Sequence, residues 1–135
     1  MTLVEKQNQM ISEINALGDC FDQYAYLLVK AQELPGLPAE FLTPENHVNG
    51  CQSDVWLIIH TGNGRLSIEA DSDTLILRGV LRILQELFED APLAEAASLN
   101  VCLFTDTELG ATFTSDRNTG VKTILKRIAD TAAGS

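Results

Sequence analysis

Residues 54–70, which read DVWLIIHTGNGRLSIEA, decide the fold. The segment DVWLIIH (54–60) is rich in β-branched and aromatic residues, and RLSIEA (65–70) alternates apolar with polar residues. The TGNG between them contains residue types that tolerate the positive φ of a tight turn. The stretch therefore predicts a β-hairpin, and a hairpin needs helices packed against one face to be stable.

The sequence on both sides of the hairpin predicts helices, because apolar residues recur there at helical spacing. A first helix runs from Val4 to a stop at Gly18, and Asp19 caps a second helix that ends at Pro35. NHV (46–48) is a candidate short edge strand. Further helices are expected within 71–90, over 93–97, around 106–109 and after 115–120. The fold class is therefore α+β, with a small antiparallel β-sheet of about three strands packed against N- and C-terminal helices.

Composition limits the class of protein. A length of 135 residues suits a single domain over 1–135, and 45% hydrophobic with 21% charged residues is ordinary for a globular chain. The net charge of -10 repels phosphate backbones and argues against nucleic acid as a partner. There is no signal-peptide pattern, and no apolar run approaches the roughly 18 residues of a membrane helix. We expect a cytoplasmic protein that does not bind membranes.

Three cysteines, Cys20, Cys51 and Cys102, form an odd set without a CxxC pair. This pattern favours free thiols in a reducing cytosol over a disulfide framework, and the wide spacing argues against a metal site. Cys20 and Cys102 are expected to be small core residues. Cys51 lies in HVNGCQSDVW (47–56), directly after Gly50 and before two hydrogen-bonding residues. That context fits a reactive thiol presented at a bend, and it fits a half-buried loop cysteine equally well.

Three residues with ring side chains lie in or near this segment of the sequence. His47 is close enough to Cys51 to assist a thiolate, and its alternative is an exposed strand residue. His60 ends a predicted strand and is expected at the surface. Trp56 is expected to pack the sheet against a helix. No residue spacing fixes a general base beside Cys51, which argues against Cys–His protease chemistry.

Four segments together resemble one family. NGCQSDVW (49–56) closely resembles the sulfur-acceptor signature of the SufE family, which includes CsdE-like relatives. YAYLLVKAQELPGLP (24–38), EADSDTLILRGVLRIL (69–84) and TSDRNTGVKTILKRI (114–128) are similar to further family segments in the same order. The resemblance implies a SufE/NifU-like fold.

The resemblance also implies a function in iron–sulfur cluster assembly. Cys51 would take persulfide sulfur from a pyridoxal-phosphate cysteine desulfurase of the SufS/CsdA type and stimulate that enzyme. It would then pass the sulfur to an iron–sulfur scaffold protein. The chain itself would need no cofactor beyond its cysteine persulfide, because the pyridoxal phosphate belongs to the partner. This is a sulfurtransferase-type half-reaction without independent turnover.

The same resemblance assigns further residues to the sulfur loop or to partner binding: Gly50, Gln52, Ser53, Asp71, Asp73 and Arg117. Asp71 and Asp73 match an acidic turn, and helix capping is their alternative role. Arg117 would steady a sulfur anion or pair with one of these carboxylates, and a surface salt bridge is its alternative. Asp116 beside it departs from the family pattern and weakens a purely cationic role.

Two other functions stay open at this point. One is a regulatory adaptor that binds the desulfurase without accepting sulfur. The other is a cluster or metal-binding scaffold, which needs about three cysteines brought together. The wide spacing of the cysteines disfavours the scaffold.

Overall fold

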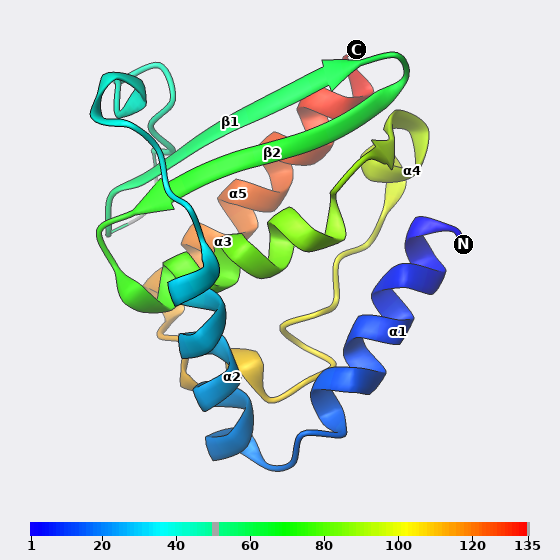
Figure 1. The fold of residues 1–135 in the computed structure, drawn as a ribbon, viewed down its shortest axis with the longest axis vertical. Coiled ribbons are helices and arrows are strands. Elements are labelled where there is room, and N and C mark those ends of the chain that lie inside the picture. Colours follow the sequence, from blue (N-terminus) through cyan, green and yellow to red (C-terminus); the bar gives the residue numbers. More distant parts are fainter. Residues whose placement is uncertain (50–51, 135) are drawn as a thin grey trace.

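The computed structural model describes residues 1–49 and 52–134, and Figure 1 shows how its elements are arranged. The elements in chain order are α1 (Leu3–Asn15), α2 (Cys20–Glu33), the short 3₁₀ helix η1 (Ala39–Phe41), β1 (Val55–Gly62), β2 (Arg65–Ser72), α3 (Leu75–Leu87), β3 (Ala91–Pro92), α4 (Leu93–Ser98), the 3₁₀ helix η2 (Leu109–Thr112) and α5 (Ser115–Ala133). The predicted α+β class is confirmed. None of these helices combines the length and apolarity needed to cross a bilayer.

The sheet is built on the predicted hairpin. β1 and β2 are antiparallel and are joined by Asn63 and Gly64, whose positive φ values of 54° and 75° suit a two-residue turn. The sheet has three strands in the order β1-β2-β3. Its third regular strand is the two-residue β3, and the edge strand predicted at 46–48 is only partly confirmed. The backbone N–H of His47 is bonded within a turn to the carbonyl of Thr43, and this segment reaches β1 only as an isolated bridge.

One face of the hairpin carries the core. The register places Val55, Leu57 and Ile59 of β1 opposite Ser72, Ala70 and Ile68 of β2. Helices α3 and α5 run along this same side of the hairpin (Figure 1). The side chains that fill the space between the layers are almost fully buried, among them Leu81, Leu84, Ile124 and Ile128. Burying this apolar surface is the main favourable term in folding.

Helix starts follow local capping chemistry. The Asp19 carboxylate accepts hydrogen bonds from the backbone N–H of Phe21 and of Asp22, which confirms the predicted cap of α2. Thr114 caps α5 in the same way through the N–H of Arg117. The segment 115–120, expected to precede the last helix, is therefore its first turns. The short helix expected around 106–109 is instead η2, a few residues later.

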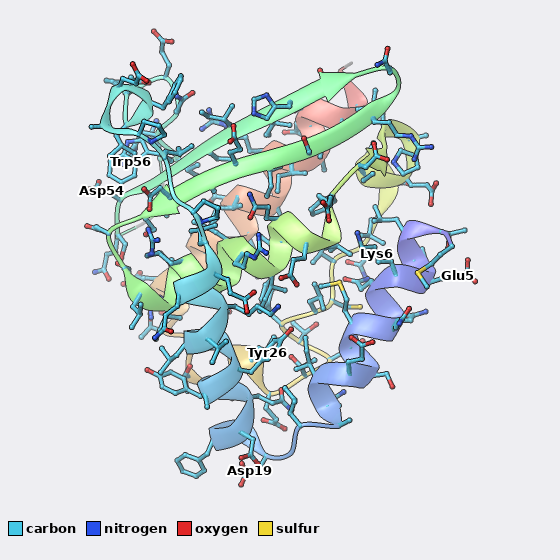
Figure 2. The ribbon with its side chains drawn as sticks, viewed as in Figure 1. Glu5, Lys6, Asp19, Tyr26, Asp54 and Trp56 are labelled. Carbon is cyan, nitrogen blue, oxygen red and sulfur yellow. The ribbon has the colours of Figure 1, made fainter. Side chains whose placement is uncertain are left out.

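Three side-chain placements differ from expectation. Trp56 lies on the outer face of β1, opposite Asp71, and meets the edge of the His47 ring, so it does not pack the sheet against a helix (Figure 2). Strand alternation explains this, because its neighbours Val55 and Leu57 occupy the core face. The thiols of Cys20 and Cys102 are half-buried rather than in the core.

Helices α2 and α3 approach each other at Gly79. A Cβ atom at this position would lie 2.3 Å from the backbone carbonyl oxygen of Leu27, closer than real Cβ contacts allow. The glycine therefore permits backbone of one helix to touch the other, and α2 is held against α3 by that contact.

We expect Gly79→Ala to lower the free energy of unfolding by about 1–3 kcal/mol, the usual cost of overpacking. The sign of the change in stability is informative. Helix propensity alone would make this substitution stabilising by about 1 kcal/mol, so a loss of stability reports the close contact. Urea unfolding measures the change. Gly62→Ala is the control, since no atom lies within 4 Å of its added Cβ. Equal losses in both variants would contradict the close helix contact.

Candidate functional site

The segment 49–54, here called the cysteine segment, lies in the chain between a short stem and β1. The stem, residues 45–48, is joined to β1 by two backbone hydrogen bonds of 2.8 Å, from Val48 to Val55 and from Leu57 to Asn46. These bonds bring the two ends of the cysteine segment together. The predicted acceptor Cys51 and the predicted sulfur-loop residue Gly50 lie outside the described residues.

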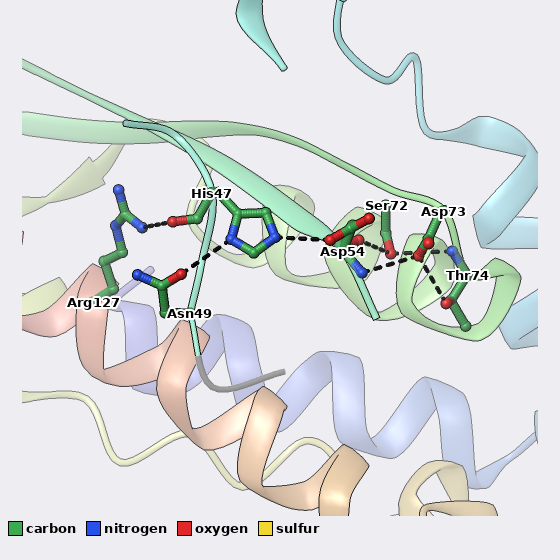
Figure 3. Close-up of polar contacts among 7 residues, drawn as sticks. All are labelled: His47, Asn49, Asp54, Ser72, Asp73, Thr74 and Arg127. Carbon is green, nitrogen blue, oxygen red and sulfur yellow. Dashed lines mark hydrogen bonds and ion pairs between the residues drawn. The ribbon is translucent and has the colours of Figure 1, made fainter. Parts of the chain in front are cut away.

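The far end of the cysteine segment is fixed to the end of β2. The backbone N–H of Asp54 donates to the Asp73 carboxylate at 3.1 Å, and the Ser72 hydroxyl donates to the Asp54 carbonyl at 2.7 Å (Figure 3). The Asp73 N–H also reaches that carbonyl, at 3.3 Å. Since Ser72 is buried, its hydroxyl needs such a partner. This junction holds the predicted residue Asp73 against the cysteine segment.

The His47 imidazole bridges the two ends of the cysteine segment. Its Nε2 lies 2.9 Å from a carboxylate oxygen of Asp54, and its Nδ1 lies 3.3 Å from the Asn49 amide oxygen (Figure 3). A carboxylate only accepts hydrogen bonds, so Nε2 carries a proton. These two contacts fix the orientation of the ring between the ends of the cysteine segment. A side chain that was merely exposed on a strand would have no such partners.

A small pocket lies where the cysteine segment meets α3 and α5. The residues that line it are Gln52, Ser53, Leu77, Thr114, Asp116, Arg117 and Gly120. Gln52 and Asp116 are exposed, while Ser53 and Arg117 are half-buried. The structure therefore brings three of the predicted residues, Gln52, Ser53 and Arg117, to one place. An arginine there supplies a cation and hydrogen-bond donors suited to an anion.

Asp71 is directed elsewhere. Its carboxylate forms an ion pair with Arg78 and accepts the Leu37 N–H at 3.0 Å, and Arg78 donates to the Leu34 carbonyl at 3.1 Å. These contacts attach the turn after α2 to the start of α3. Within the described residues Arg117 forms no ion pair with either predicted carboxylate. Neither carboxylate is the N-cap of α3, a position that Thr74 occupies.

Three contributors to the site escaped sequence reasoning. Asn49 and Asp54 lie within the motif NGCQSDVW (49–56), but no spacing or repeat marks them as more than neighbours of Cys51. Arg127 lies far away in the chain, yet its guanidinium donates to the carbonyls of His47 and Glu45, each at 2.9 Å. Such a contact depends on the packing of α5, so only a tertiary model reveals it.

Cys102 has a chemical environment of its own. Burial raises the pKa of its thiol, and the adjacent Asp106 carboxylate raises it further by hydrogen bonding and by charge. Its backbone N–H donates to the buried Gln7 side chain at 2.9 Å. A raised pKa leaves little thiolate at neutral pH, and the thiolate is the reactive form.

The comparisons with known proteins agree on one family. Residues 8–132 match the model of the SufE family, described as an Fe-S metabolism associated domain. A SufE-like protein of Rhizobium etli is 36% identical over 130 residues, covering 93% of this chain and 88% of the relative. A SufE-like protein of Rhizobium meliloti is 31% identical over 132 residues and covers 94% of both chains.

A solved structure supports the same fold. The solution structure of a hypothetical protein from Thermus thermophilus superposes with a TM-score of 0.79, covering 96% of this chain and 94% of the other at 17% identity. At that identity the likeness concerns the fold alone. The family match and the two relatives carry the assignment: the chain belongs to the SufE family and is associated with iron–sulfur metabolism.

Proposed function

We propose that the protein is a sulfur acceptor and carrier that takes persulfide sulfur onto Cys51 from a pyridoxal-phosphate cysteine desulfurase. The observation that carries the proposal is the placement of Gln52, Ser53 and Arg117 around one small pocket beside the cysteine segment. Membership of the SufE family supports the same chemistry. The sulfur would then go to an iron–sulfur scaffold protein in the cytoplasm.

The transfer is a thiol exchange that balances without an oxidant. The Cys51 thiolate attacks the outer sulfur of the persulfide on the desulfurase, so a new S–S bond forms on Cys51. The S–S bond in the donor breaks, and the donor cysteine leaves as a thiolate. The two electrons of the broken bond depart with that leaving group. The carrier, acting as one domain over 1–135, needs no cofactor of its own.

Charge distribution suggests how the neighbouring residues contribute. The half-buried Arg117 would stabilise the thiolate and the persulfide anion. Gln52 and Asp73 are exposed and would meet the partner, and Ser53 would offer a hydrogen bond within the pocket. Asp71 would support partner binding indirectly, by holding the turn after α2 through Arg78.

The role of Cys51 is tested by its substitution. We expect Cys51→Ser to reduce the desulfurase to the rate it shows without the carrier, because serine cannot accept the sulfur. Sulfide release from L-cysteine in the presence of a desulfurase measures the rate. Cys20→Ser and Cys102→Ser are matched controls that retain stimulation. Full stimulation by Cys51→Ser would instead identify a regulatory adaptor.

The role of Arg117 is tested by the titration of the Cys51 thiol. Removing a nearby cation raises a thiol pKa by about 1 unit. We therefore expect Arg117→Ala to slow alkylation of Cys51 at pH 7 by up to roughly tenfold, and Arg117→Lys to preserve most of the rate. Mass spectrometry of iodoacetamide-treated protein across a pH series follows this. Superimposable profiles for the three chains would remove Arg117 from the proposal.

Cys102 should behave as a slow thiol because of its raised pKa. We expect Asp106→Asn to lower that pKa and to accelerate alkylation of Cys102 several-fold at pH 8, since the thiolate fraction rises as the pKa falls. Asp130→Asn, which alters an exposed carboxylate paired with Lys126, is the control. An unchanged rate in Asp106→Asn would show that Asp106 does not suppress this thiol.

A further inference from the structure

The stem, residues 45–48, pairs on one side only with the sheet. Its Asn46 carbonyl and Val48 N–H bond to β1, as residues two apart on an antiparallel strand do. The His47 carbonyl between them points away from β1, and the Glu45 carbonyl belongs to the turn at the start of the stem. Both carbonyls are left free by β1 and form the open edge of the stem. Within the part of the chain that the structure describes, the strand pairing of the stem is limited to one isolated bridge from His47 to Trp56.

Arg127 of α5 covers that open edge. One guanidinium nitrogen donates to the His47 carbonyl and the other donates to the Glu45 carbonyl, each at 2.9 Å (Figure 3 shows the first). A planar fork with two donors matches two carbonyls that point in one direction. The side chain takes the place of the next strand and attaches the stem to a helix.

The charge of Arg127 serves two backbone carbonyls and no carboxylate. Lys30, Arg78, Arg82 and Lys126 all pair with carboxylates. Among the described residues Arg127 forms no ion pair, and its guanidinium donates to the two backbone carbonyls. A cation donating to carbonyls makes stronger hydrogen bonds than a neutral donor, so this contact favours one position of the stem.

The same helix meets both sides of the cysteine segment. Arg117 lines the pocket beside Gln52 and Ser53, and Arg127 holds the stem ten residues, or about 15 Å, farther along α5. A shift of the stem relative to α5 would therefore change the distance between the cysteine segment and the Arg117 pocket.

We propose, on the basis of the function proposed above, that Arg127 is a positioning residue for sulfur uptake. It fixes the stem 45–48 to α5 and so sets the cysteine segment against the Arg117 pocket. Arg127 touches no reacting atom. Arg127 increases the fraction of molecules whose stem is held in its position against α5. It therefore affects the maximal rate of sulfur uptake and not the affinity for the desulfurase.

Amide hydrogen exchange tests the clamp itself, independently of sulfur chemistry. In Arg127→Ala we expect the Val48 and Leu57 amides, the donors of the two stem bonds, to exchange at least about fivefold faster, which at 1.36 kcal/mol per tenfold corresponds to about 1 kcal/mol. Amides in the middle of α3 report global stability and should not change. Lys126→Ala, at the next position of α5 with an exposed ion pair, is the matched control and should leave both sets unchanged.

Steady-state kinetics test the positioning role. With a desulfurase and L-cysteine, Arg127→Ala should lower the maximal stimulated rate about fivefold while the half-saturating carrier concentration stays within about twofold. Arg127→Lys, with one nitrogen for two carbonyls, should recover part of the rate.

Each outcome decides a separate point. Unchanged exchange at Val48 and Leu57 in Arg127→Ala would overturn the clamp. Faster exchange with a wild-type rate of sulfur uptake would overturn the positioning role. A wild-type chain that accepts no sulfur would overturn the proposed function and the positioning role with it, while exchange would still support or reject the clamp.

Discussion

The register of the β1–β2 hairpin is the constraint on which the site depends. Pairing Val55 with Ser72 places Asp54 beside Asp73, so the end of the cysteine segment and the acidic turn are joined by hydrogen bonds. A slip of one residue would move every apolar side chain of a strand from the core to the outer face, and for that reason the buried inner face fixes the register. The packing of the apolar core therefore determines where the polar groups of Asp54 and Asp73 lie.

The second support of the site is α5. It packs against β1 through its buried side chains and presents two arginines to the region around the cysteine segment. The hairpin holds one end of that segment, and the helix holds the stem that leads into the other. Placing reactive groups between rigid elements keeps them within a narrow range of positions, as the proposed sulfur exchange between two proteins would require.

Sequence reasoning predicted what depends on local chemistry. The alternation in 65–70, the Asn63-Gly64 turn and the Asp19 cap were each correct, because period, turn residues and caps are local properties. The two-residue strand β3 was missed, since a strand so short has no periodic pattern. The contacts of Arg127 and Asp71 depend on which elements pack together, and the family resemblance, not spacing, identified Cys51.

The other proposed residue roles all depend on Cys51 carrying the sulfur. Incubation of the wild-type chain with a desulfurase and L-cysteine, followed by peptide mass spectrometry without reductant, tests it most directly. We expect a gain of one sulfur atom, about 32 Da, on the peptide containing Cys51. Sulfur found instead on the peptides of Cys20 or Cys102 would contradict it.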